Sequence, residues 1–151
     1  MEVRLIGYDK VQRMLKKLGS DVSTRQLMAE IGQFVQTSIK HRTQKQGVDV
    51  YYDSFDDYSV GHRKRREEKG LPVDTVDLTF TGSMFASMTQ EEFEEQVNIF
   101  FTPTQDRTGM SNPEKAYYLN EGREFFGISD FEEEKLVNMA LDHIDDLLRG
   151  V

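Results

Sequence analysis

The chain has 151 residues and a formal net charge of −8, with 30% charged residues, 37% hydrophobic residues and no cysteine. This size and composition fit one globular domain with a single core, and the lack of cysteine excludes disulfide frameworks, thiolate metal sites and cysteine nucleophiles. No stretch approaches the roughly 20 apolar residues of a membrane span, and the first residues do not form a signal peptide, so we expect a soluble intracellular protein.

Charge is divided unevenly along the chain. Residues 1–75 carry 14 Lys and Arg against 11 Asp and Glu, whereas residues 76–151 carry 5 against 16. A uniformly basic nucleic-acid-binding protein would not show this division. It suits a subunit whose basic face meets an acidic face of a neighbour, and it is equally compatible with two helices whose solvated faces differ in sign.

Two amphipathic helices are predicted at the N-terminal end. The first spans residues 9–18 and ends at Gly19. The second starts with a capping box of Ser23 and Gln26 and continues to about Gln46, where the next residue, a glycine, stops it. Its core-facing stripe recurs at helical spacing and consists of Leu27, Met28, Ile31, Phe34, Val35 and Ile39.

A long loop with one short helix is predicted over residues 48–72. Its aromatic residues alternate with aspartates without a sustained helical or strand period, and a basic run follows before Gly70 and Pro72 close the segment. Loops of this length in compact domains are usually functional or mobile. The aromatic residues are Tyr51, Tyr52, Phe55 and Tyr58.

Extended structure is predicted in the middle of the chain. The apolar residues of Val73–Phe80 favour an extended segment, Phe93–Phe101 alternates as a strand does, and Arg123–Gly127 reads as a short strand. Residues 83–88 fit either a short helix or a strand, and residues 116–122 fit one or two helical turns.

The last element is a long helix that begins at a second capping box, formed by Ser129 and Glu132. Its predicted apolar face consists of Val137, Ala140, Leu141, Ile144, Leu147 and Leu148. Together the elements predict a single α+β domain over residues 1–151. Long N-terminal and C-terminal amphipathic helices would pack on a small, mainly antiparallel sheet.

The sequence contains no catalytic or cofactor-binding motif. Since a phosphate-binding loop, a dinucleotide fingerprint, a nucleophile elbow and a zinc-binding helix are all missing, we expect no enzyme activity, cofactor or metal. Two alternatives stay open. Asp49, Asp53, Asp56 and Asp57 with His62 would supply the ligands and base of a small metal-dependent nuclease, and the acidic C-terminal half would suit an inhibitor that mimics DNA.

The run Arg63-Lys64-Arg65-Arg66 is the sharpest charge signal in the chain. Such a run can bind phosphates, but it has no interleaved aromatic residue and two glutamates follow it directly. It is therefore compatible with a DNA contact, a protein interface or a solvated helix face.

Three local patterns make the chain resemble the phage virion-morphogenesis family, the small tail-completion or neck proteins of tailed bacteriophages and prophages. The first is a long amphipathic helix that runs into a Gly/Asp/aromatic segment, Gly47–Tyr58, and then a basic stretch. The second is the turn Leu78-Thr79-Phe80-Thr81-Gly82-Ser83-Met84. The third is a Tyr-containing segment that ends at Gly122, followed by Arg123-Glu124-Phe125-Phe126-Gly127-Ile128-Ser129 and a closing acidic helix. The likeness covers roughly residues 24–149.

This resemblance implies a structural virion protein without catalysis. Such a subunit would assemble into a ring at the head–tail junction or the top of the tail, complete the tail and give DNA a passage. Its partners would be further copies of itself and other phage neck or tail proteins, with transient, non-specific DNA contact and no membrane. We would then expect the protein in the virion, after assembly in the host cytoplasm.

The predicted protein interface combines the long loop with the segment after Gly122. Arg123 has an equally good structural interpretation, in which it pins the entry of the last helix to the sheet. The predicted interface residues are Tyr51, Tyr52, Phe55, Tyr58, Arg63, Lys64, Arg65, Arg66, Arg123, Phe125 and Phe126.

Overall fold

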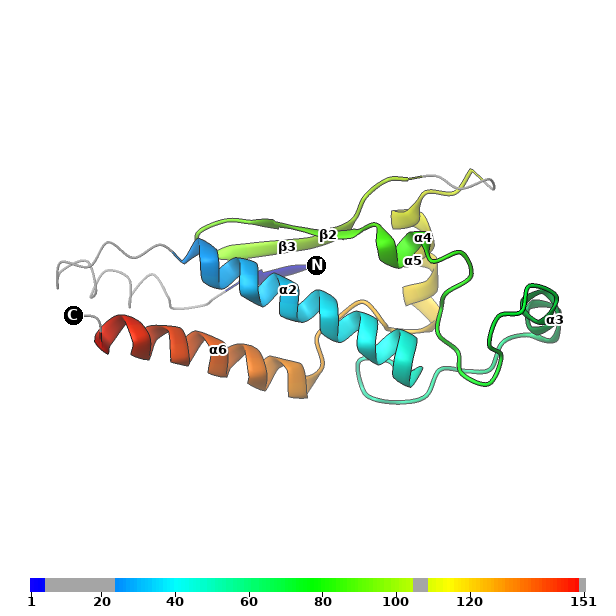
Figure 1. The fold of residues 1–151 in the computed structure, drawn as a ribbon, viewed down its shortest axis with the longest axis horizontal. Helices are drawn as coiled ribbons and strands as arrows, with labels where there is room; N and C mark the ends of the chain where they lie inside the picture. Colours follow the sequence, from blue (N-terminus) through cyan, green and yellow to red (C-terminus); the bar gives the residue numbers. More distant parts are fainter. Residues whose placement is uncertain (5–23, 105–108, 150–151) are drawn as a thin grey trace.

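The computed structural model describes residues 1–4, 24–104 and 109–149, and these form an α+β fold. Helix α2 (Arg25–His41) lies between a three-stranded sheet on one side and helix α6 (Asp130–Arg149) on the other (Figure 1). Helices α4 (Ser83–Ala86) and α5 (Asn112–Gly122) pack together at one end of the sheet. The predicted α+β class is therefore confirmed. The helix predicted over residues 9–18 lies outside the described residues.

Helix α2 supplies the centre of the core, as its apolar period predicts. It ends in a π-helical turn, η1 (Arg42–Gln46), and Gly47 closes that turn in a left-handed conformation with φ 68°. The proposed cap at Ser23 lies outside the described residues. The side chains that α2 buries against the sheet and α6 include Leu27, Met28, Ile31, Val35 and Ile39.

Gly32 marks the closest approach of α2 to the sheet. A methyl group at this position would lie 2.5 Å from Oε1 of Gln90 and 2.8 Å from Cγ2 of Val97. No real side chain tolerates such contacts, so a glycine is needed where the helix crosses the strands.

The sheet is antiparallel, in the order β1 (Glu2–Arg4), β3 (Gln96–Phe101) and β2 (Met88–Glu92). The single strand predicted over Phe93–Phe101 is only half right, because a turn at residues 93–95 separates β2 from β3. Glu94 and Glu95 in that turn interrupt the alternation of apolar and polar residues. The alternation of β3 itself holds, with Val97, Ile99 and Phe101 buried.

Two other predicted extended segments are wrong. Residues 73–80 and residues 123–127 are irregular and belong to no strand of the described chain. In both segments backbone carbonyls accept hydrogen bonds from a buried arginine side chain instead of from a neighbouring strand: Thr79 from Arg66, and Phe125 and Gly127 from Arg42. These carbonyls thus bond to arginine side chains from other elements instead of to a neighbouring strand, and the local alternation of apolar residues does not show this.

Helix α5 begins earlier than the sequence indicated. A capping box at Ser111 and Glu114, with Pro113 in the first turn, starts the helix at Asn112. Hydrogen bonds from Ser111 to the Glu114 carboxylate hold the pKa of that carboxyl below its usual range.

Helix α6 starts as predicted, and the face through which it packs is only partly the predicted one. The Glu132 carboxylate accepts from the Ser129 backbone, and the Ser129 hydroxyl accepts from Glu132 N, which confirms the capping box. The residues that face α2 and the core are Glu132, Leu136 and Met139. Half of the predicted apolar stripe follows this face: Ala140, Ile144 and Leu147 are half-buried. The other half is exposed, with 52% of Val137, 56% of Leu141 and 52% of Leu148 accessible to solvent.

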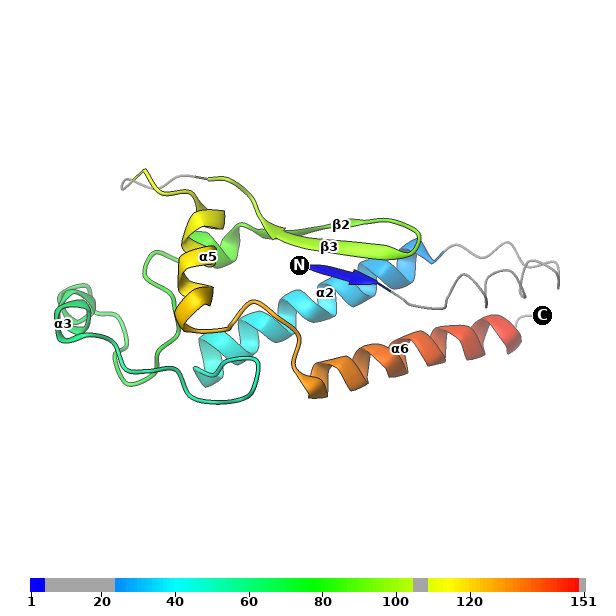
Figure 2. The ribbon, with the colours of Figure 1, turned by 180° about the vertical axis from the view of Figure 1, so that it is seen from behind.

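Helix α3 (Val60–Glu68) projects from the far end of the molecule, beyond α5 and away from the sheet (Figures 1 and 2). The sequence predicted this short helix within the loop over residues 48–72, and it is present. The chain leaves the core at Gly47 and returns beside it, since a methyl group at Gly47 would lie 2.7 Å from Cγ2 of Thr75. We call residues 48–75 the α3 arm.

Candidate protein interface

A tight turn presents the first aromatic residues of the α3 arm. The Asp49 carboxylate accepts hydrogen bonds from the backbone nitrogens of Tyr51 (2.8 Å) and Asp53 (2.9 Å), which organises the turn. Tyr51 and Tyr52 are exposed at its tip, whereas Phe55 inserts into the core with 8% of its surface accessible. Of these predicted interface residues, the two tyrosines are therefore available to a partner and Phe55 serves the subunit's own core.

This turn lies directly against the segment that follows α5. The backbone nitrogen of Val50 donates to the Glu124 carbonyl over 2.9 Å, and Arg123 Nη2 donates to the Asp56 carbonyl over 3.1 Å. A methyl group at Gly127 would lie 2.9 Å from Cγ1 of Val50, so the two segments pack without a gap. Two parts of the predicted interface that are about 70 residues apart in sequence thus form one surface.

Arg66 is the anchor of the α3 arm rather than part of its outer surface. Its side chain is 1% exposed and donates to the carbonyls of Pro72 (2.8 Å) and Thr79 and to the Asp77 carboxylate (3.1 Å). Its guanidinium lies 4.5 Å from the ring centroid of Tyr58. Arg66, a predicted interface residue, is therefore buried within its own subunit and cannot contact a partner. Tyr58 is half-buried, so only part of its side chain is accessible to a partner.

The other three residues of the basic run face solvent. Arg63, Lys64 and Arg65 are exposed and form no ion pair among the described residues. Val60, one turn before Lys64, is 88% exposed although it is apolar. The tip of the molecule therefore combines an exposed apolar side chain with three unpaired cations.

His62 lies on the inner side of α3, between the rings of Tyr58 (4.9 Å between centroids) and Phe80 (5.6 Å). Burial lowers its pKa below the ordinary value for histidine, and the positive charges of Arg66, Arg65 and Arg123 lower it further. The described residues contain no group of three or more His, Asp or Glu placed to hold a metal ion.

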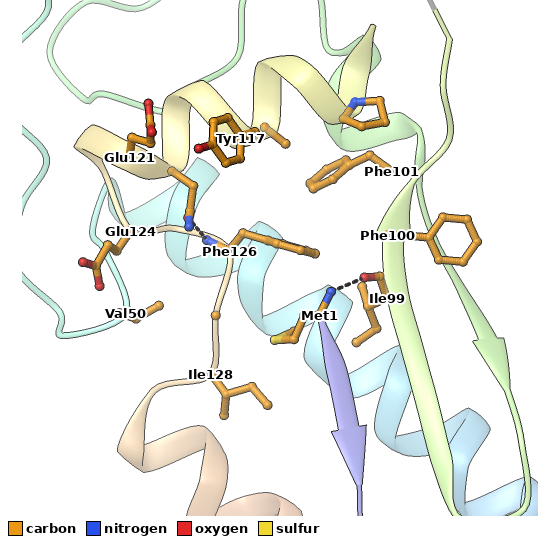
Figure 3. A pocket seen from close by; sticks show the side chains of 14 residues that line it. Met1, Val50, Ile99, Phe100, Phe101, Tyr117, Glu121, Glu124, Phe126 and Ile128 are labelled. Atoms are coloured by element: carbon orange, nitrogen blue, oxygen red, sulfur yellow. Dashed lines mark hydrogen bonds between the residues drawn. The ribbon is translucent and has the colours of Figure 1, made fainter.

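A pocket of about 560 Å³ opens between α5, strand β3 and the segment after α5 (Figure 3). Its volume falls in the usual range of ligand pockets. The floor is apolar and is formed by Met1, Ile99, Phe101, Phe126 and Ile128. Beside these side chains lies the terminal ammonium of Met1, which donates to the Ile99 carbonyl over 2.8 Å and whose pKa is lowered by burial. We call this hollow the α5 pocket.

Carboxylates gather on one side of the α5 pocket. Glu121 and Glu124 line it, and Figure 3 shows both side chains on the same side as Tyr117 and Val50. A hydrogen bond with Glu124, the charge of that carboxylate, a small degree of burial, and the charges of Asp49 and Asp130 raise the pKa of Tyr51. Glu121 and Glu124 therefore form an acidic rim on this side of the α5 pocket.

The acidic rim has no ion-pair partner among the described residues. Neither Glu121 nor Glu124 pairs with a Lys, Arg, His or the terminal ammonium there. Tyr117, 62% exposed at the same rim, has a raised pKa mainly because its hydroxyl is hydrogen-bonded to Glu121. The rim thus presents acceptors and negative charge around an apolar floor.

A buried ion pair positions the wall of the α5 pocket, and no sequence pattern predicts it. Arg42, 1% exposed, pairs with Glu132 and donates to the carbonyls of Phe125 and Gly127 over 3.0 Å each. The end of α2 is thereby fixed to the start of α6. Phe125 is fully buried against Phe85 and Phe101, so this predicted interface residue belongs to the core, whereas Phe126 remains half-buried in the pocket.

The structure therefore leaves eight predicted interface residues accessible to some degree: Tyr51, Tyr52, Tyr58, Arg63, Lys64, Arg65, Arg123 and Phe126. The sequence missed the acidic rim, whose only signal was the excess of acidic residues after residue 75. No helix of the described residues is both long and apolar enough to cross a membrane. Comparisons with protein-family models, with curated proteins and with solved structures find no match for the chain.

Proposed function

We propose that this chain is a structural subunit of a tailed-phage virion, which assembles into a ring around the DNA passage at the neck or the top of the tail. The observation that carries the proposal is a pair of oppositely charged surfaces on different elements, the cations of α3 and the acidic rim, neither of which has an ion-pair partner among the described residues. A closed ring built from one kind of subunit uses two different complementary faces at each contact.

The resemblance to the virion-morphogenesis family supplies the place in the particle. The three patterns that carry it fall on the arm, the turn before α4 and the segment between α5 and α6, which border the exposed surfaces described above. Acidic side chains that face a channel also keep DNA from adhering as it passes, because like charges repel.

Electron microscopy combined with genetics tests this function. Light scattering of the purified protein across a concentration series should show a discrete oligomer mass. Electron micrographs of that species should show rings with a central opening wide enough for duplex DNA. Deletion of its gene from the phage or prophage genome that encodes it should leave full heads and tails that do not join. Normal infectious particles after deletion would refute the function.

A further inference from the structure

We propose that the tip of α3 in one subunit docks into the α5 pocket of a second copy of this chain, with Val60 entering the pocket and the α3 cations meeting its acidic rim. This inference rests on the proposed ring function and names the two surfaces that would form each contact in the ring.

The chemistry of the two surfaces is complementary. Val60, Arg63 and Lys64 occur at i, i+3 and i+4, so one face of α3 carries an apolar side chain beside two cations. The α5 pocket offers an apolar floor with carboxylates along one side. Neither set of charges has an ion-pair partner among the residues that the structure describes, so association would satisfy both at once.

The α3 arm is presented as a rigid ligand. Arg66 and His62 hold its inner face against residues 72–80 through hydrogen bonds and ring contacts. The outer face is therefore already ordered before docking, which lowers the conformational entropy that association costs. Because Val60 is 88% exposed, α3 does not fill the pocket of its own subunit.

The two surfaces lie on different parts of the subunit, so their contact is head-to-tail. Helix α3 is at the far tip, whereas the α5 pocket lies beside β1 and β3 (Figures 1 and 3). Such a heterologous contact forms a closed ring when its rotation closes, and each added subunit leaves one tip and one pocket free until closure. A self-complementary dimer would consume both surfaces and stop.

Charge reversal provides the first test. The variant R63E/K64E/R65E has an acidic tip, and the variant E121K/E124K has a basic rim. Each should weaken self-association at least about 10-fold, because like charges would then meet at the contact. None of the five residues forms an ion pair within the described chain, so the urea midpoint of R63E/K64E/R65E should stay unchanged. The midpoint of E121K/E124K should fall only slightly, because the hydrogen bonds that this variant loses, to Tyr117 and Tyr51, are exposed.

Mixing the two variants should restore assembly. The acidic tip of the first fits the basic rim of the second, and the basic tip of the second fits the acidic rim of the first. Light scattering of the mixture should therefore recover the wild-type mass, and so should a single chain that carries all five changes. The control R25E/K45E/K135E alters charge equally at other exposed positions and should assemble like wild type.

Disulfide trapping gives a direct readout, since the chain has no cysteine of its own. Mixed V60C and Y117C proteins should form a cross-linked heterodimer under mild oxidation. The pair V60C and V137C, whose second site is similarly exposed on α6, should not.

The outcomes separate this contact from the proposed function. Rings that persist in every charge variant, without the V60C–Y117C cross-link, would overturn the docking and leave the ring function standing. Normal particles after gene deletion would overturn the function, while the cross-link would still report the contact. A third outcome would also overturn the docking. If R63E/K64E/R65E loses salt-sensitive DNA binding and mixing it with E121K/E124K does not restore assembly, the tip binds nucleic acid and does not dock into the pocket.

Discussion

Replacement of Arg42 by methionine tests the buried ion pair that joins α2 to α6. Methionine keeps much of the apolar stem but removes the charge, so the Glu132 carboxylate, 4% exposed, stays buried without its cation. The carbonyls of Phe125 and Gly127 also lose their donors. Breaking one side of a buried pair costs about 3–5 kcal/mol.

The expected loss is therefore about 4 kcal/mol of unfolding free energy, a large part of the roughly 5–15 kcal/mol that holds a domain folded. For a chain of this length it corresponds to a Tm lower by about 8–16 °C. Urea unfolding, followed by circular dichroism, should show a lower midpoint with an unchanged slope, since the surface exposed on unfolding stays the same.

Two further variants show whether the burial of the pair is responsible. Arg149→Met breaks an exposed ion pair to Asp145 and should cost under about 0.5 kcal/mol. Adding Glu132→Leu to Arg42→Met removes the stranded carboxylate and should recover at least about 1 kcal/mol, even though the backbone of Ser129 loses its acceptor. A loss below about 1 kcal/mol in Arg42→Met alone would refute the reasoning.

Three more predictions address the packing of α2, the anchor of the α3 arm and its histidine. Gly32→Ala should destabilise the fold by about 1–3 kcal/mol in urea unfolding, because the new methyl group collides with Gln90. The control Gly61→Ala, where the methyl group meets open space, should be neutral or stabilising by up to about 1 kcal/mol. Equal effects of the two substitutions would contradict this. Tyr58→Phe removes a hydroxyl that donates to the Asp77 carboxylate over 3.0 Å and accepts from the Asp77 backbone nitrogen. Amide hydrogen exchange in α3 should therefore accelerate about 5- to 10-fold, while the core stays protected. Unchanged exchange in α3 would argue against the anchor. The ring of His62 should titrate by NMR below the ordinary histidine value, because burial and neighbouring arginines lower its pKa. The stability that its neutral form contributes is then present above the unfolded pKa and is lost as pH falls through the folded pKa. A titration midpoint at or above the ordinary value would refute this.

Local sequence patterns predicted the elements that local rules determine. The apolar period of α2, the left-handed stop at Gly47 and the capping box at Ser129 depend on residues within a few positions of one another, and all three are present. Apolar and β-prone residues predict extended structure at 73–80 and 123–127, but the sequence does not show which groups hydrogen-bond to their carbonyls. In the fold Arg66 donates to Thr79, and Arg42 donates to Phe125.

Burial at the predicted interface was harder to predict for a physical reason. Arg66 and Phe125 stand among residues of similar type, yet only the tertiary fold decides that the arginine turns inward to three acceptors and the phenylalanine enters the core. The acidic rim is also invisible in sequence, because only the tertiary fold places Glu121 and Glu124 together on one side of a pocket.

The contact between Gly47 and Thr75 also bears on how this protein can diverge in evolution. The chain leaves and re-enters the core at one spot, and within the arm Phe55, Tyr58 and Arg66 are tied to the rest of the subunit. Lengthening a flexible loop twofold costs only about 0.6 kcal/mol of closure entropy. Insertions and substitutions at the exposed positions of residues 60–65 can therefore accumulate rapidly, and the tip can change its binding specificity while the anchors and the helix–sheet core stay as they are.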